Sequence, residues 1–492
     1  MEPTVTERRG ARPKVVEHPS IEERRSRGKG QRKRVPPGSH AKWKPSDDRP
    51  DPIDLLEQQN LTREPDLVPV RHGRMMVSPF TFYRGAAKIM AADLKDTPRA
   101  GLDVQLCGDA HLSNFGVFAS PERTLLFDLN DFDETLPGPF EYDVKRMTAS
   151  FVIAGRNNGF SKADSRAAAL SAVGSYRSAM AEFAQMRVMD IWYARMSEDD
   201  LRAALRMQEK AFQRAAKTKA DREDVAARIA RTQKLLDKAH TRDSLQALGK
   251  LAEYVDGRYR IVSQPPIVVP ARDLMRIYGF SGEELQQALH QQFRRYRATL
   301  QHDRRKLLER FELVDVARKV VGVGSVGTRA FIALLQGRDQ DDPLFLQSKE
   351  ATRSVLEDHL PRSRYRQAGQ RVVEGQRMLQ AASDIYLGWT KAHQDGRFMY
   401  WRQLRDMKAS AAVEQMIPTG LSFYGKLCGW TLARAHARSG DPIAIAAYLG
   451  KSNAFDKAIV DFAERYADQN EKDYKAFVKA IKAGRLAAQK GV

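Results

Sequence analysis

The spacing of apolar residues in the first third of the chain is typical of mixed strands, turns and short helices. Residues 51–154 are rich in aromatic residues, Gly and Pro. A turn signal at residues 119–123 separates two apolar runs. Residues 115–118 and 124–129 are therefore predicted to form a β-hairpin.

Helical spacing dominates the middle of the chain. Between residues 161 and 318, apolar residues recur three and four positions apart, most clearly in 167–183 and 285–316. A strand-like run at 259–270 interrupts this pattern. Lys and Arg on these helices alternate with Asp and Glu, which indicates solvated faces rather than a binding surface.

The last third predicts strands followed by helices. From residue 320, strand-like runs surround one helical stretch at about 369–388, and residues 421–438 and 453–484 return to amphipathic helix. The expected α+β chain has five parts: a basic, disordered arm at 1–50, a part with the candidate catalytic loop at 51–160, a helical part at 161–317, a β-rich unit at 318–410, and closing helices at 411–492.

Composition narrows the class of protein. With 492 residues, of which 42% are hydrophobic, the chain is not wholly disordered or fibrous and has room for two to four packed units or one large enzyme. Two cysteines, Cys107 and Cys428, cannot supply a disulfide framework. No run of about 18 uncharged apolar residues is present. We therefore expect a cytoplasmic protein that is not secreted and does not span a membrane.

The formal net charge of +20 suits nucleic acid, acidic lipids or phosphorylated ligands equally well. The first fifty residues hold 14 Lys and Arg against 7 Asp and Glu, so this arm carries about a third of the excess charge. The arm is expected to be mobile, and either to hold RNA or DNA or to dock on its own domain.

The clearest candidate for chemistry is the segment Cys107-Gly-Asp-Ala-His-Leu-Ser-Asn114, directly before the predicted hairpin. Phosphoryl transfer to a hydroxyl needs a carboxylate that accepts the nucleophile's proton and oxygen ligands for Mg²⁺. Asp109 as catalytic base and Asn114 as metal ligand supply both. A second metal ligand is expected after the next strand, at Asp128 or Asp131. Capping of the hairpin is the alternative role for these residues.

These residues resemble the catalytic loop and metal-binding Asp of protein-kinase-like phosphotransferases of the aminoglycoside and choline kinase type. The matching residues are Gly108, Asp109, His111, Asn114, then Asp128 or Asp131, then Asp143. Cys107 stands where that family has a His. The resemblance implies a two-lobed kinase-like fold with a large helical lobe, ATP and Mg²⁺ as cofactors, and a hydroxyl on a small molecule or a protein as acceptor.

A phosphate-binding loop of the kind such a site needs occurs later in the chain. Gly322, Gly324 and Gly327, with Ser325 between them, form a G-x-G-x-x-G loop whose amides suit phosphate oxygens. Lys349 ends a strand-like run that follows the loop, and is expected to bind the non-transferred phosphates.

Further residues complete the expected nucleotide site. Glu374, on the predicted helix, is expected to hold Lys349 in place, with Glu357 as a second candidate. Gln403 and Leu404 follow the strand that would lead to a hinge beside the adenine. Residues 425–436 resemble the helix that precedes the catalytic loop in small-molecule kinases, although here they come far after it. A circular permutation is therefore expected.

Taken whole, the chain resembles a bacterial family known only as a domain of unknown function. The resemblance lies in RKRVPPGSHAKW, DPIDLLEQQN, LVPVRHGRMMVSPFTFYRGAA, GDAHLSNFGVFASPER, FDLNDFDETLPGPFEYDVKRMTAS and VGVGSVGTR followed by LQSKEA. It covers nearly the whole chain and implies one catalytic unit without naming a substrate.

The sequence leaves three other functions open. Adenylate transfer would use the same scaffold and residues. A non-catalytic, nucleic-acid-associated protein would bind through the basic arm, which is the less favoured reading. A dinucleotide-binding fold would place the glycines before a helix at 328–337, with Asp339, Asp341 or Asp342 at the ribose.

Three arginines, Arg71, Arg74 and Arg84, lie in the aromatic segment before the candidate catalytic loop. They could bind an anionic group of the acceptor or the phosphates of the nucleotide. Pairing with structural acids is the alternative role.

Overall fold

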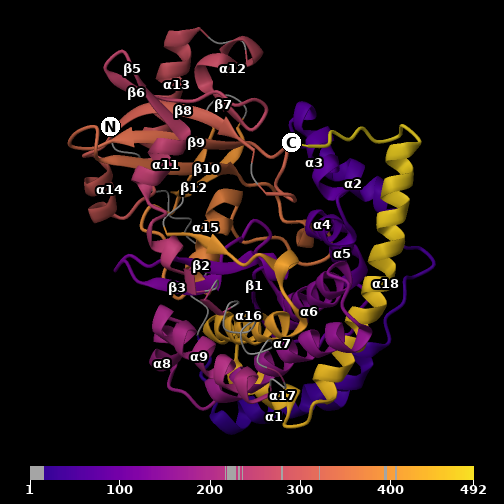
Figure 1. Cartoon of the computed structure of the whole chain (residues 1–492). Helices are drawn as coiled ribbons and strands as arrows, with labels where there is room; N and C mark the ends of the chain where they lie inside the picture. Colours follow the sequence, from indigo (N-terminus) through magenta and orange to yellow (C-terminus); the bar gives the residue numbers. More distant parts are fainter. Residues whose placement is uncertain are drawn as a thin grey trace.

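The computed structural model shows a strand-rich unit above a helical unit, so the expectation of an α+β protein is confirmed (Figure 1). The structure describes residues 16–215, 218, 229–230, 233–234, 236–278, 281–320, 322–392, 396–404 and 407–491. Within these residues, no helix combines the length and the apolar character needed to cross a membrane.

A six-stranded antiparallel sheet forms the strand-rich unit. Its spatial order is β11-β12-β10-β9-β8-β7. The strands are β7 (Val268–Pro270), β8 (Glu312–Lys319), β9 (Ala330–Gln336), β10 (Pro343–Glu350), β11 (Gly388–Lys391) and β12 (Phe398–Gln403). Helix α15 (Ala368–Leu379) lies between β10 and β11 in the chain and packs against β11 and β12.

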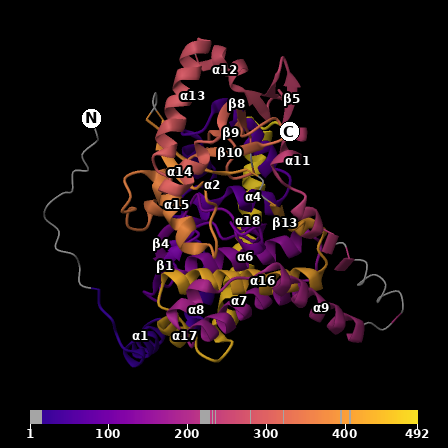
Figure 2. The same ribbon diagram turned by 90° about the vertical axis from the view of Figure 1, so that its left-hand side faces the viewer.

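Both faces of this sheet are covered, because neighbouring residues of β10 point to opposite faces and both are apolar. Leu346 packs with Trp401 of β12 and Phe293 on one face. Phe345 packs with Leu248 on the other face. The covering elements are α11 (Ser244–Leu251), the hairpin β5 (Ala252–Val255) and β6 (Arg258–Ile261), α12 (Ala271–Tyr278), α13 (Gly282–Arg297) and α14 (His302–Leu308), seen around the sheet in Figure 2.

This packing changes two expectations. Residues 244–308 cover the sheet, so they belong with the strands and not with the helical part expected at 161–317. The helical prediction for 285–316 is wrong at its end, since β8 begins at Glu312. The β-branched Val316 pairs there with β9, and sheet pairing outweighs the helix-like spacing of its apolar residues.

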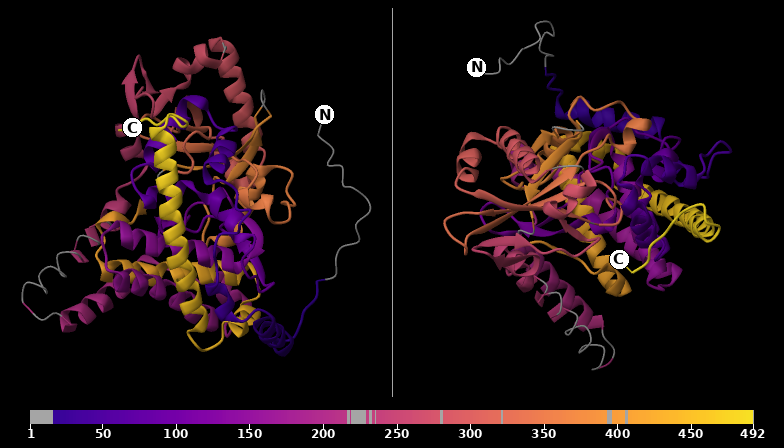
Figure 3. Two further views of the ribbon diagram at one scale, coloured as in Figure 1. Left: turned by 90° about the vertical axis from the view of Figure 1, so that its right-hand side faces the viewer. Right: turned by 90° about the horizontal axis from the view of Figure 1, so that it is seen from above.

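The helical unit is built around α7 and α16, which lie in close contact. An added Cβ at Gly429 would come within 2.0 Å of the Ala172 carbonyl oxygen, so only glycine allows this approach. Helix α18 runs along the outside of the molecule towards α2 and α4 (yellow in Figures 1 and 3). The helices are α6 (Phe140–Asn157), α7 (Lys162–Phe183), α8 (Val188–Tyr193), α9 (Glu198–Ala215), α16 (Pro418–Ser439), α17 (Pro442–Leu449) and α18 (Ala454–Lys482).

Two small sheets lie between the units. In the first, β1 (Asp103–Leu106) pairs with β4 (Leu136–Pro139). In the second, β2 (Phe115–Ala119) pairs with β3 (Leu125–Leu129) and with β13 (Ala409–Ser410). Phe115 lies opposite Leu129, which confirms the predicted hairpin. Strand β13 is the next strand after β12, so the chain crosses here from the strand-rich to the helical unit.

The chain before β1 forms a helical segment that contacts both units. Its elements are α1 (Ile21–Arg34), α2 (Pro52–Asn60), α3 (Val68–Met75), α4 (Pro79–Gly85) and α5 (Ala87–Leu94). The backbone amide of Glu64 donates to the Gly327 carbonyl of the strand-rich unit at 2.8 Å. The Tyr83 hydroxyl donates to the Arg146 carbonyl of α6, also at 2.8 Å.

The expectation of a disordered arm over residues 1–50 is wrong from residue 16 onward; residues 1–15 lie outside the described part. Helix α1 begins with a capping box between Ser20 and Glu23 and packs on α17. Arg32 donates to the Tyr448 carbonyl at 2.6 Å, at the end of α17, where carbonyl groups lack helical partners. Arg32, one of the cations of the arm, therefore helps to bind the arm to the helical unit of the same chain.

Replacement of Gly28 by Ala is expected to loosen α1, because the added Cβ would lie 2.1 Å from the Ala444 carbonyl oxygen. Overpacking of this kind costs about 1–3 kcal/mol. Gly30 has nothing within 4 Å, so Gly30→Ala is the matched control and should slightly stabilise the helix. Thermal unfolding and limited trypsin digestion measure the effect. Equal protease resistance of wild type and Gly28→Ala would contradict the docking.

Candidate functional site

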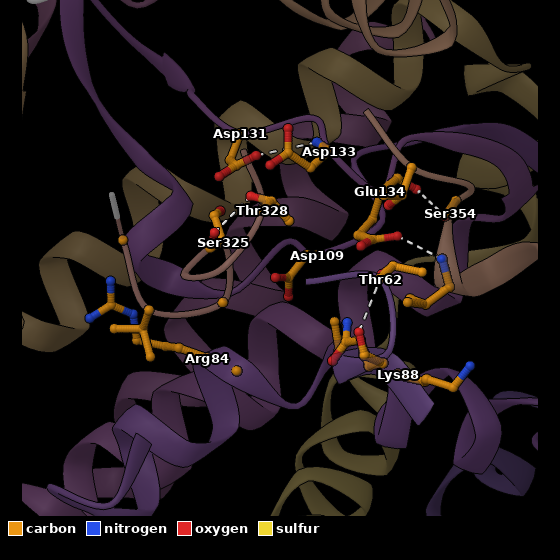
Figure 4. Close-up of a pocket in the computed structure, with 18 of the residues that line it drawn as sticks. Thr62, Arg84, Lys88, Asp109, Asp131, Asp133, Glu134, Ser325, Thr328 and Ser354 are labelled. Carbon is orange, nitrogen blue, oxygen red and sulfur yellow. Dashed lines mark hydrogen bonds between the residues drawn. The ribbon is translucent and has the colours of Figure 1, made fainter. Parts of the chain in front are cut away.

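A pocket of about 300 Å³ lies where the two units meet the N-terminal helices (Figure 4). Six of the expected site residues line it, although they come from distant parts of the sequence: Asp109, Asn114, Asp131, Gly322, Gly324 and Ser325. Six other expected site residues do not line this pocket: Asp128, Gly327, Lys349, Glu374, Gln403 and Leu404. Figure 4 shows Asp109 near the centre, with Asp131 and Asp133 on one side and Glu134 on another.

Asp143 of α6 fixes the candidate catalytic loop from behind. The backbone amides of Cys107 and Gly108 donate to its carboxylate at 2.6 and 2.9 Å. His436 of α16 lies 3.2 Å from the same carboxylate. Gly108 has φ +89°, and an added Cβ would lie 2.2 Å from the Glu134 carbonyl oxygen, so the turn requires glycine.

Two contacts hold the end of β3 beside this loop. The Cys107 thiol donates to the Asp131 carbonyl, with a sulfur–oxygen distance of 3.2 Å. The backbone amide of Asn130 donates to the Asn114 carbonyl at 2.9 Å. Cys107 therefore ties the loop to Asp131 through its thiol, at the position where a His was expected from the resemblance.

Asp109 faces the pocket with a fifth of its side chain exposed, and Arg146 holds it from the other side. The Arg146 Nε donates to Oδ1 of Asp109 at 2.7 Å, and its guanidinium stacks on the Tyr83 ring at 3.8 Å. Burial raises the pKa of Asp109, and Arg146 opposes that rise without cancelling it. Asp109 is thus a fixed carboxylate of increased basicity, as a general base requires.

Asn114, in the short turn η3 (Leu112–Asn114), and Asp131 are the expected metal ligands, and both line the pocket. The Asn114 side-chain amide donates to the Asp109 carbonyl at 2.7 Å, so its Oδ1 is the atom that could bind a metal ion. Burial disfavours the charge of Asp131, but Lys349 and Arg402 lower its pKa below the usual value.

No group of three or more His, Cys, Asp or Glu side chains suited to a metal ion occurs in the described part of the chain. The Asn114 and Asp131 pair is a set of two hard oxygen donors. Mg²⁺ is commonly held by one or two protein carboxylates or carbonyls, with phosphate and water completing its shell. The donor set therefore fits Mg²⁺ bound together with a nucleotide.

Asp128 is not placed to be the metal ligand. It lies within β3, where both its side chain and that of Arg434 are 1% exposed and form an ion pair. The backbone amide of Ala381 also donates to its carboxylate, at 2.8 Å. Asp128 points into the core because it is still part of the strand, whereas Asp131 follows the strand end and faces the pocket.

Lys349 pairs with Asp133 and not with Glu374, so the expected lysine–glutamate pair is corrected. The Lys349 Nζ lies 3.5 Å from Asp133, whose other oxygen accepts from the Tyr400 hydroxyl at 2.6 Å. Glu374 instead pairs with Arg377, one turn along α15, at 3.4 Å. The counter-ion of Lys349 thus comes from the segment that also carries Asp131, the expected metal ligand.

Helix α15 is anchored to that segment by an arginine that sequence reasoning missed. Arg371 is 2% exposed and donates to the carbonyls of Thr135 at 2.6 Å, Asp133 at 2.8 Å and Thr352 at 2.9 Å. Glu357, the second candidate partner of Lys349, lies by Arg353 and Arg371 instead. The three acids of the NDFDET segment were the available signal for Asp133.

The glycine-rich loop joins the antiparallel strands β8 and β9. Its residues Gly322, Gly324 and Ser325 line the pocket. Gly322 has φ +68°, and a Cβ at Gly324 would lie 2.9 Å from the Arg84 carbonyl oxygen. Arg74 donates to the Gly322 carbonyl at 2.6 Å, so the N-terminal helices support the loop. The helix at 328–337 that a dinucleotide fold requires is absent, since β9 occupies residues 330–336.

Gln403 and Leu404 lie where the chain leaves β12 and line a second pocket of about 220 Å³. Asn130, Gln347 and Lys408 are further members of its polar lining. Burial, aided by the charges of Arg402 and Lys349, lowers the pKa of Lys408 to about 7. The position at the junction of the two units suits a hinge, and contact with the adenine stays a prediction.

Glu134 makes the stability of the site sensitive to pH. Burial raises the pKa of its carboxyl from 4.5 to about 7, although Arg371 and the Val355 amide oppose this. Between these pH values the folded protein keeps a proton that the unfolded chain has lost. The free energy of unfolding therefore falls as the pH rises, by about 3 kcal/mol in total.

Replacement of Glu134 by Gln is expected to remove this pH dependence, because an amide oxygen can still accept from the Val355 amide, now 2.7 Å away. Urea unfolding at pH 5 and pH 8 measures the effect. The stability of Glu134→Gln relative to wild type should rise between the two values. An unchanged difference would show that Glu134 is already ionised at pH 5.

A family model described as "Uncharacterized protein conserved in bacteria (DUF2252)" matches residues 63–480. The match covers both units, the candidate catalytic loop and the glycine-rich loop. No curated protein and no solved structure matches the chain.

Proposed function

The chain belongs to the DUF2252 family of bacteria, and from the site we propose that it is an ATP- and Mg²⁺-dependent phosphotransferase acting on a hydroxyl group. The observation that carries the proposal is the meeting of Asp109, Asn114 and Asp131 with the loop at Gly322 and Gly324 in one pocket. A base, two metal ligands and a phosphate-binding loop are the parts that phosphoryl transfer needs.

The architecture supports a kinase-like fold for this proposal. The glycine-rich loop joins β8 and β9, Lys349 lies on the next strand, and α15 precedes two further strands of the same sheet. The chain then crosses to a unit in which the catalytic loop leads into the β2–β3 hairpin and ends at the metal ligand. This is the order of parts expected from the resemblance.

The ends of two distant segments support a circular permutation. The last turn of α16 lies beside β1, where the Gln105 backbone amide donates to the Ser439 hydroxyl at 3.1 Å. A Cβ at Gly440 would come within 2.6 Å of the Val104 side chain. A chain joined here would run from α16 through β1 into the catalytic loop, the order found in small-molecule kinases.

The residues of the site then have definite roles. Asp109 accepts the proton of the acceptor hydroxyl, and Arg146 keeps the carboxylate aimed at the pocket. The acceptor oxygen forms a bond to the terminal phosphorus, the bond to the bridging oxygen breaks, and ADP leaves with that electron pair. Asn114 and Asp131 would hold Mg²⁺, which neutralises charge on the phosphates when bound. Amides of the glycine-rich loop orient the phosphates.

Labelled ATP tests the proposal and its adenylate alternative. Purified protein is incubated with Mg²⁺ and ATP labelled at either the terminal or the innermost phosphate. Release or transfer of the terminal label supports phosphotransfer, whereas attachment of the innermost label to protein supports adenylate transfer. Absence of both reactions, with no rise in melting temperature on addition of Mg²⁺ and ATP, would contradict a nucleotide-dependent enzyme.

A further inference from the structure

The N-terminal helices contribute a wall of the pocket that the catalytic loop, the metal segment and the glycine-rich loop do not explain. In Figure 4, Thr62, Arg84 and Lys88 lie on the side of Asp109 opposite Asp131 and Asp133. The residues of this wall are Gln58, Gln59, Thr62, Arg63, Arg84, Gly85, Ala87 and Lys88. An acceptor hydroxyl that reaches Asp109 from this side would lie against the wall.

The acidic residues of the pocket are already engaged by partners of their own. The pairs are Asp109 with Arg146, Asp131 with the Asp133 amide, Asp133 with Lys349, Glu134 with the Val355 amide, Glu350 with Arg397, and Asp358 with Lys88. Arg353 lies near Glu357 and Asp358. Each of these acids therefore already has a partner within the protein, and Asp131 is the expected ligand of the metal ion.

Arg84 differs from these residues, because no hydrogen bond or ion pair reaches its guanidinium from any described residue. Its Nε is buried without a partner, and so is the Nε of Arg63 on the same wall. Arg63 is only 9% exposed, and among the described residues its guanidinium donates to the Val326 carbonyl. A buried nitrogen of a guanidinium that lacks a hydrogen-bond acceptor costs free energy that an anionic ligand would recover.

The other two arginines of this segment are committed to structure. Arg71 is fully buried and donates to Asn60, Gln59 and the Gly85 carbonyl. Arg74 donates to the Gly322 carbonyl of the glycine-rich loop. Of the three arginines, Arg84 is thus the one that lines the pocket and whose guanidinium makes no hydrogen bond or ion pair with a described residue.

We propose that the acceptor is a small molecule that carries an anionic group, a phosphate or a carboxylate, and that Arg84 binds this group. The proposal rests on the proposed function, since it names the second substrate of the same site. A pocket of about 300 Å³ walled by helices on one side suits a small molecule better than a protein chain. Charge-assisted bonds from arginine suit either anion.

A binding experiment on the full chain tests this directly. The protein is saturated with Mg²⁺ and a non-hydrolysable ATP analogue, and its melting temperature is followed as inorganic phosphate or acetate is added. The melting temperature of wild type is expected to rise with one of these anions. A rise with phosphate indicates a phosphate group on the acceptor, and a rise with acetate indicates a carboxylate. Arg84→Gln should weaken that anion's binding about tenfold or more and keep the analogue's own stabilisation.

Arg353→Gln is the matched control, because Arg353 lines the same pocket, is 48% exposed and already lies by two acids. It should bind the anion as wild type does.

Equal anion binding by Arg84→Gln and wild type, or no anion effect in wild type, would overturn the proposal. Loss of the anion effect once the analogue is bound would show that Arg84 binds the nucleotide's phosphates, which also overturns it. Failure of the ATP analogue to bind would contradict the proposed function but not the anion site. Titration of the anion in the absence of nucleotide would still test whether Arg84 binds it.

Discussion

Replacement of Asp109 by Asn is expected to lower the rate of phosphoryl transfer by about a thousandfold, within the range that general bases contribute. The amide cannot take the proton of the acceptor hydroxyl. It can still accept from the Arg146 Nε, now 2.7 Å from the carboxylate, so the buried guanidinium keeps its hydrogen bond and the loop its shape. The loss should therefore lie in the rate and not in folding.

Transfer of the terminal phosphate from labelled ATP measures this effect, and the rise in melting temperature with Mg²⁺ and ATP shows that the nucleotide still binds. Asp96→Asn is the matched control, because Asp96 is 56% exposed and forms only a loose contact of 3.8 Å with Lys95. An unchanged rate in Asp109→Asn would remove Asp109 from the chemistry and leave it a structural role beside Arg146.

Local patterns in the sequence predicted the parts of the site that depend on neighbouring residues. The β2–β3 hairpin follows from a turn signal between two apolar runs. The loop at Asp109 and Asn114 and the one at Gly322 and Gly324 are continuous motifs, so their chemistry is visible before folding. That both loops line one pocket depends on packing between residues more than two hundred positions apart, which the kinase-like resemblance anticipated.

The ion-pair and hydrogen-bond partners of these residues could not be predicted, because they depend on how distant parts of the chain pack together. Spacing favoured Glu374 for Lys349, yet α15 is turned so that Arg371 meets the carbonyls of residues 133 and 135, and Asp133 reaches the lysine. Arg146 was also missed. It lies one helical turn after Asp143, so both the residue that fixes the loop and the one that holds Asp109 project from α6.

Composition alone misjudged the N-terminal arm for a related reason. A low content of apolar residues predicts disorder, but α1 docks through Gly28 and through arginine bonds to the end of α17. These contacts need few apolar side chains. The arginines that dock α1 in this way therefore give no indication of a nucleic-acid partner.

Asp128 and Asp131, three residues apart, are expected to respond in opposite ways to replacement by Ala. Asp128→Ala leaves Arg434 charged and 1% exposed without its counter-ion, which should cost about 3–5 kcal/mol of unfolding free energy. Asp131→Ala should leave the urea midpoint close to wild type and abolish the part of the nucleotide's thermal stabilisation that depends on Mg²⁺. Urea unfolding, and melting curves with ATP in the presence and absence of Mg²⁺, measure the two effects. The reverse pattern would make Asp128 the metal ligand and would show that the end of β3 is rearranged when the metal binds.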